Sequence, residues 1–141
     1  MSRVPALPLT TAQALRRTCQ RMLRAHRKRA AAEGKVLDYG LEQLLQLAHE
    51  KRTCLYCLLP VGLDFQLDHL DPIARGGPHT LLNLEVVCPR CNKLKGMLTR
   101  PEFEALRLLL KALHPVASED LCRRLLAGGG AAYARHRRKG F

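Results

Sequence analysis

Asp68 and His69 stand side by side in the segment "LDFQLDH", and Asn92 follows the segment "VVCPRC". Asn83 and Asn92 are the only two asparagines of the 141-residue chain. Carboxylate and amide oxygens are the ligands that hard divalent cations such as Mg²⁺ and Mn²⁺ prefer. If the helix that carries Asn92 packs against the strand that carries Asp68, the two oxygens converge. The residue types therefore predict a cation site with positions left for water and phosphate.

Four of the six cysteines form two C-x-x-C pairs, Cys54 with Cys57 and Cys88 with Cys91. Two such pairs can close a tetrahedral thiolate cage around zinc, which leaves no open position for catalysis. The gap between the pairs is longer than in a simple zinc ribbon, so we expect a folded insertion there. Cys19 and Cys122 have no partner at ligand spacing, and we expect them in the core.

The apolar pattern indicates mainly helices with one short hairpin. Pro89 suits the first position of a short helix, and Gly96 suits its end. Asp38 is the expected cap of the second helix, and Gly128–Gly130 are the expected stop of the last one. The expected elements are helices over 11–32, from Asp38 to about 50, over 89–95, after Thr99 and from Ser118, and strands over 63–69 and 84–87.

This pattern gives the fold class α+β, with a hairpin and helix stapled by a four-cysteine zinc site and surrounded by helical extensions. We expect a basic N-terminal helical extension over 1–50, a metal-binding core over 51–99, and C-terminal helices with a basic tail over 100–141. The three segments are expected to form one compact domain, because the chain has the length of a single domain.

The charge balance indicates a polyanionic partner. The chain carries 24 Lys and Arg against 12 Asp and Glu, a formal net charge of +12, and so basic a small chain most often meets nucleic acid. Phosphate contacts are expected from Arg17, Arg21 and Arg24 in the first helix, from Arg75 in the loop and from Lys95. A solvated basic face is the alternative for each of them.

No secretory signal is visible in "MSRVPALPLT", and no apolar run reaches the roughly 20 residues that cross a bilayer. We therefore expect a cytoplasmic protein without a membrane partner. The remaining histidines are expected to be solvated, including His79 in the loop. The others are His26, His49, His114 and His136.

"LDH" at 67–69, "NL" at 83–84 and "CPRCNKLKG" at 88–96 together resemble the HNH endonuclease family. The intervening "DPIARGGPHTLLNL" is similar to the family's Pro and Gly-Gly loop. The resemblance covers residues 54–98 closely, and it implies a ββα-metal core, often stapled by two C-x-x-C pairs. The chain departs from the family name because Asn92 stands where a second His is usual, which makes it an H-N-N variant.

The resemblance implies a role for each matched residue. His69 looks like the general base, Asp68 and Asn92 look like the catalytic metal ligands, and Asn83 looks like the residue that fixes the loop and orients His69. The implied reaction is hydrolysis of DNA phosphodiester bonds to 5′-phosphate and 3′-hydroxyl ends, by nicking or double-strand cleavage with low sequence preference. An amide ligand at Asn92 favours Mg²⁺ or Mn²⁺ over softer ions.

Three other interpretations remain open at this point. The chain could be a non-catalytic zinc-stapled DNA-binding module, a zinc-stapled protein adaptor, or a nuclease that acts on RNA. Proteins that look like this occur in phages, sometimes near DNA-packaging genes, and in bacterial restriction settings. We therefore expect the cytoplasm of a bacterial cell or an infected host, with a phage packaging or host protein as a candidate partner. Oligomeric state is not readable from the sequence.

Overall fold

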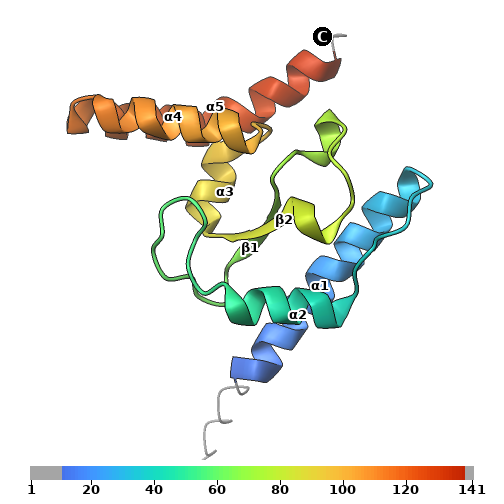
Figure 1. The fold of residues 1–141 in the computed structure, drawn as a ribbon. Helices are drawn as coiled ribbons and strands as arrows, with labels where there is room; N and C mark the ends of the chain where they lie inside the picture. Colours follow the sequence, from blue (N-terminus) through green and yellow to red (C-terminus); the bar gives the residue numbers. More distant parts are fainter. Residues whose placement is uncertain (1–10, 139–141) are drawn as a thin grey trace, which may run out of the picture.

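The computed structural model describes residues 11–138, with side chains up to residue 128 (Figure 1). Residues 1–10 of the expected N-terminal extension and 139–141 of the expected basic tail lie outside this range, as does the side chain of His136. The fold is α+β, as predicted. One two-stranded antiparallel sheet lies between helices α1 and α2 on one side and helices α3, α4 and α5 on the other (Figure 1).

Helix α1, Thr11–Ala32, forms because apolar side chains recur along one face, and Leu15, Cys19 and Leu23 on that face are buried. The helix ends at Ala32, and Gly34 in the following turn has a φ of +67°, a left-handed conformation that glycine adopts readily. Helix α2, Leu41–Glu50, then packs against α1 and buries Leu44.

The predicted cap of α2 is wrong. Gly40 is the N-cap, and its backbone N–H donates to Gln43 Oε1 at 2.9 Å. Asp38 instead accepts a hydrogen bond from the backbone N–H of Leu81 at 2.8 Å. Its carboxylate therefore ties the α1–α2 connection to the loop of the central hairpin.

Strand β1, Gln66–His69, pairs antiparallel with β2, Leu84–Val87, and His69 lies opposite Leu84 in the register. The predicted first strand began three residues too early, at 63. The loop between the strands contains two short 3-10 helices, Ile73–Arg75 and Leu81–Asn83. Gly77 is required in this loop, because a Cβ there would lie 1.9 Å from the backbone oxygen of Asp71.

Helix α3, Pro89–Lys95, follows β2 directly and ends at Gly96, as predicted. Helix α4, Arg100–Ala112, begins at the Thr99 cap, whose hydroxyl accepts from the backbone N–H of Glu102. Helix α5 packs against both α3 and α4, while α3 contacts β1 and α2 contacts β2.

Helix α5 spans Pro115–Arg138 and differs from the prediction at both ends. It begins at Pro115 rather than Ser118, because proline fits the first helical turn and His114 Nδ1 accepts from the N–H of Val116 at 3.2 Å. It also continues through Gly128–Gly130. A glycine weakens a helix by about 1 kcal/mol, which does not force it to stop.

One hydrophobic cluster joins the N-terminal helices, the hairpin and α4. Phe65 and Val87 are fully buried in the hairpin, and Leu44 of α2 and Phe103 of α4 join them with no exposed surface. The three expected segments thus share a core, although the boundaries at 50/51 and 99/100 stay a prediction.

Candidate functional site

The sulfur atoms of Cys54, Cys57, Cys88 and Cys91 all lie within 4.8 Å of one another. A tetrahedral zinc site with Zn–S bonds of about 2.3 Å would separate its sulfurs by about 3.8 Å, and Cys57 Sγ lies 3.8 Å from Cys88 Sγ. The four thiols therefore fit a structural zinc ion, as the spacing predicted. In the part of the chain that the structure describes, no other His, Cys, Asp and Glu side chains form such a cluster.

The two cysteine pairs are held in place by backbone hydrogen bonds. The N–H of Leu58, which has a φ of +62°, donates to the carbonyl of Cys54, and the N–H of Leu55 donates to Val86 of β2. Burial raises the pKa of Cys54, but backbone N–H donors of Cys57, Cys88 and Tyr56 outweigh it and lower the value to about 7. The pocket of N–H groups therefore favours a thiolate at Cys54.

Asp68, His69 and Asn92 line one cleft of about 640 Å³. Asp68 and His69 come from the end of β1, and Asn92 comes from the middle of α3, which packs against that strand. The structure thus brings the three residues together. The opposite wall of the cleft is α1, which contributes Met22, Ala25, His26 and Arg29.

Two buried polar atoms at this cleft have no hydrogen-bond partner among the described residues, Asp68 Oδ2 and His69 Nε2. Asp68 Oδ2 does lie 3.0 Å from Lys95 Nζ in an ion pair. The Asp68 carboxylate and the Asn92 amide line the same cleft, and such oxygens are the ligands that a hard divalent cation prefers.

Burial lowers the pKa of His69 to about 3, and nearby His26, Arg29, His79 and Lys95 lower it in the same direction. The imidazole is therefore neutral near pH 7, so one of its ring nitrogens carries no proton. Burial also raises the pKa of Asp68, against the opposing effect of the Lys95 ammonium.

Asn83 is buried, and its side-chain amide makes three hydrogen bonds with the backbone of the loop. Its Oδ1 accepts from the N–H of Asp71 at 2.9 Å, and its Nδ2 donates to the carbonyls of Asp71 and Pro78 at 3.0 and 2.9 Å. Its own carbonyl accepts from the N–H of Leu70. The amide thus holds the chain on both sides of the turn that follows His69.

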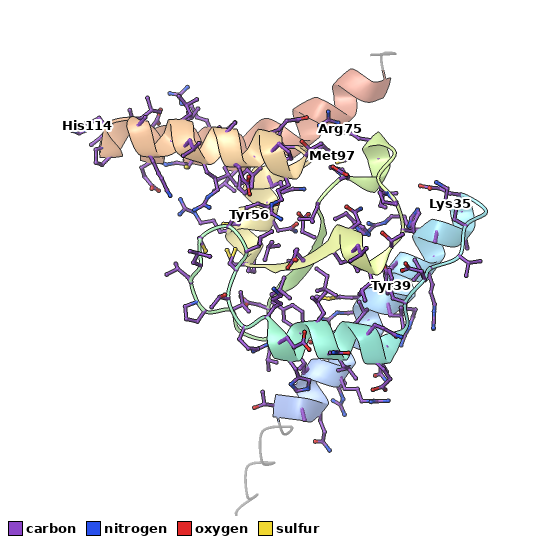
Figure 2. The ribbon with its side chains drawn as sticks, viewed as in Figure 1. Lys35, Tyr39, Tyr56, Arg75, Met97 and His114 are labelled. Atoms are coloured by element: carbon purple, nitrogen blue, oxygen red, sulfur yellow. The ribbon has the colours of Figure 1, made fainter. Side chains whose placement is uncertain are left out.

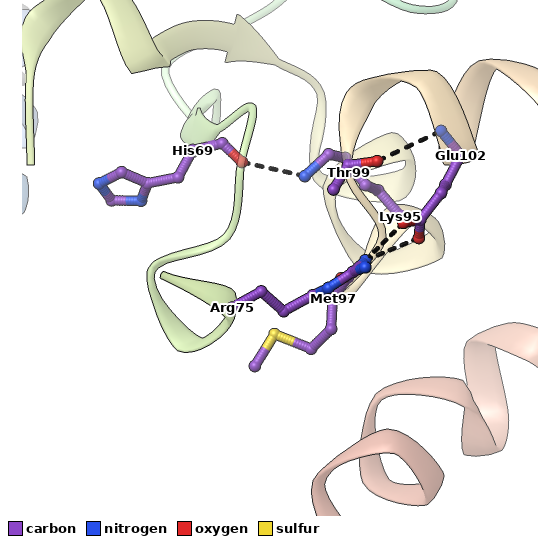
Figure 3. Close-up of polar contacts among 6 residues, drawn as sticks. All are labelled: His69, Arg75, Lys95, Met97, Thr99 and Glu102. Atoms are coloured by element: carbon purple, nitrogen blue, oxygen red, sulfur yellow. Dashed lines mark hydrogen bonds and ion pairs between the residues drawn. The ribbon is translucent and has the colours of Figure 1, made fainter. Parts of the chain in front are cut away.

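Lys95 has a partner within the protein instead of the expected phosphate. Its side chain is fully buried, and Nζ donates to the backbone oxygen of His69 at 3.0 Å and pairs with Asp68 at 3.0 Å. Figure 3 shows Lys95 reaching the His69 carbonyl while the imidazole points to the other side. The ammonium is therefore used to join α3 to the end of β1.

Arg75 is also engaged by the protein. Its guanidinium donates to both carboxylate oxygens of Glu102 at 2.7 Å and to the carbonyl of Met97 at 3.3 Å (Figure 3). This contact joins the hairpin loop to the start of α4. Arg17, Arg21 and Arg24 are exposed on α1.

Two histidines that were expected to be solvated lie beside the site. His26 is 6% exposed and its Nδ1 lies 2.8 Å from Tyr39 Oη, and His79 is 5% exposed and its Nε2 lies 2.9 Å from Glu33. The expectation was wrong for both, although His49 and His114 are exposed. A signal was present for His26, because it continues the buried face of Leu15, Cys19 and Leu23.

A two-stranded hairpin followed by a short helix, with a four-cysteine cluster at the junction, defines a small ββα domain. Residues 54–97 match the family model of the HNH endonucleases, so the chain carries an HNH endonuclease domain over this range. That domain indicates a nuclease or DNA-binding function with a nucleic acid as substrate, and the family generally uses a divalent metal. Searches of curated proteins and of solved structures give no match. None of the described helices has the length and apolar character that crossing a membrane requires.

Zinc content tests the four-cysteine cluster. We expect about one zinc ion per chain, and we expect Cys57→Ser to lose it, because three thiolates no longer close the cage. Metal analysis and thermal unfolding with and without chelator measure this. Cys19→Ala is the control, because Cys19 is buried in α1 and lies outside the cluster. Full zinc content in Cys57→Ser would contradict the assignment.

Lys95→Met should lower the free energy of unfolding by about 3 kcal/mol, because the change leaves the Asp68 carboxylate buried without its cation. Lys93→Met on the exposed side of α3 is the matched control and should change little. Denaturant unfolding measures both. Adding Asp68→Asn to Lys95→Met should recover part of the loss, and no recovery would show that the ion pair is not the cause.

Proposed function

We propose that the protein is a metal-dependent HNH endonuclease that hydrolyses DNA phosphodiester bonds to 5′-phosphate and 3′-hydroxyl ends with little sequence preference. The observation that carries the proposal is that Asp68, His69 and Asn92 line the same cleft. Its proposed setting is phage DNA processing or packaging, or restriction, in a bacterial or infected-host cytoplasm.

In this mechanism the neutral His69 imidazole accepts a proton from the attacking water. Asn83 holds the loop after His69 through its backbone hydrogen bonds, and Asp68 and Asn92 would hold Mg²⁺ or Mn²⁺. The bound cation supplies neutralisation of the phosphate charge and stabilisation of the departing 3′ oxygen. Lys95 keeps the backbone of His69 against α3.

A basic stripe on α1 supports DNA as the partner. Arg17, Arg21, Arg24 and Lys28 recur at spacings of four, three and four, which places them on one side of the helix. Each is exposed, and in the range with described side chains none of the four forms an ion pair with a carboxylate. The stripe extends over roughly 16 Å at a rise of about 1.5 Å per residue.

The stripe lies next to the cleft. Three residues of α1 that line the cleft each come one position after a cation of the stripe. These pairs are Arg21 with Met22, Arg24 with Ala25, and Lys28 with Arg29. Because one residue turns the helix by about 100°, the stripe and the cleft-lining side of α1 are about 100° apart. The phosphates of a DNA strand that is bound in the cleft would therefore lie beside the cations of the stripe. Arg16 and Arg27 directly precede Arg17 and Lys28, so they lie about 100° from the stripe on the flank away from the cleft, and Arg16 pairs with Glu42 of α2.

Supercoiled-plasmid cleavage tests the proposed reaction. We expect the wild-type protein to nick or linearise plasmid with Mg²⁺ or Mn²⁺ and not with chelator, and His69→Ala to be slower by about 10²–10⁴-fold, since the general base is lost. His49→Ala, at an exposed histidine of α2, is the matched control. Binding of plasmid without cleavage under any metal would favour the alternative, a non-catalytic zinc-stapled DNA-binding module.

Salt dependence tests the basic stripe. Arg21→Gln with Arg24→Gln should weaken DNA binding and reduce the slope of log K against log salt by about 2, because two phosphate contacts are lost. Arg16→Gln with Arg27→Gln removes the same charge from the flank of α1 that faces away from the cleft and should change the slope less. Fluorescence anisotropy with duplexes of different sequence measures both, and equal slopes for the two double variants would remove the stripe from the interface.

A further inference from the structure

Helix α1 lies outside the HNH match at 54–97, yet it forms a wall of the cleft. Two polar contacts attach this part of the chain to the hairpin loop. Glu33, just after α1, binds His79 at 2.9 Å, and Asp38 accepts from the N–H of Leu81 at 2.8 Å. The N-terminal helix is therefore fixed against the loop that follows His69.

His26 is the residue of α1 that meets His69. The two imidazole rings have centroids 5.0 Å apart and planes tilted by 52°, which is direct ring packing. His26 is itself held by the buried hydrogen bond between its Nδ1 and Tyr39 Oη. Tyr39 is 5% exposed, and its ring meets the His26 ring edge-on at 6.1 Å.

The imidazole of His69 has no hydrogen bond to any residue that the structure describes, since Lys95 bonds only to the backbone oxygen of this residue. Within the described part of the chain, no carboxylate or carbonyl therefore fixes the ring. His79 is more distant, with its ring centroid 6.4 Å from that of His69. The orientation of the His69 ring must come from packing, and His26 provides the closest ring.

We propose that His26 is a positioning residue for His69, so that the catalytic site is a composite of the HNH core and the N-terminal helix. The proposal rests on the proposed endonuclease function. Neither His26 nor His79 belongs to a metal-ligand cluster in the described part of the chain. The role of His26 is the placement of the imidazole that takes the proton, and Tyr39 holds His26 in the packing position.

The test compares His26→Ala, His26→Phe and wild type on a short duplex with Mn²⁺, with His49→Ala as an exposed-histidine control. His26→Ala should lower kcat by about 10–100-fold and leave KM within about twofold, because misplacement of a reacting group costs rate and not binding. His26→Phe keeps the ring contact and should retain most of kcat. If His26→Ala does not fold, His26→Leu, which fills the volume without a ring face, replaces it.

An activity-free measurement accompanies the kinetics. Imidazole NMR of the metal-free protein should show one ordered state of the His69 ring in wild type and His26→Phe, and averaging in His26→Ala. If the wild-type protein does not cut DNA, the endonuclease proposal fails, and the NMR comparison alone decides the positioning role. The positioning proposal is overturned if His26→Ala keeps wild-type kcat and an ordered His69 ring, or if His26→Phe is as impaired as His26→Ala.

Discussion

The rest of the structure depends on the four-cysteine cluster. It connects the turn at Cys54–Cys57 with the junction between β2 and α3, so it fixes the direction in which the short helix leaves the hairpin. A helix as short as Pro89–Lys95 is not stable by itself in water. Once its first turn is held by Cys88 and Cys91, Asn92 faces the end of β1, and the cleft follows from that geometry.

The helices outside the HNH match complete this small core. A two-stranded hairpin is at best marginally stable alone, and here α2 covers β2 while α3 contacts β1 and is itself covered by α5 (Figure 2). The buried contact of Lys95 with Asp68 and His69 belongs to the same arrangement, because it joins α3 to the strand that carries the site. Stability and site geometry therefore depend on the same contacts.

The sequence predicted the fold class, the four-cysteine cluster, the β1–β2 hairpin and the helix that carries Asn92, since each depends on local spacing. It did not predict the partners of long cationic side chains. Lys95 and Arg75 were expected at phosphates, and the partners they have, Asp68 and Glu102, are distant in the sequence. The burial of His26 was readable from its place on the apolar face of α1, whereas its contact with His69 depends on how α1 packs.

The contacts between α1 and the hairpin also have a consequence for synthesis on the ribosome. Glu33 and His79 are 46 positions apart, and Asp38 and Leu81 are 43 apart. Contacts between such distant segments form only after both have emerged, and they form later than local helix. The basic helix therefore leaves the ribosome well before the cleft can close around His69. The residues of the proposed DNA-binding stripe are therefore made first, and the assembled cleft appears only after Asn92 has been made.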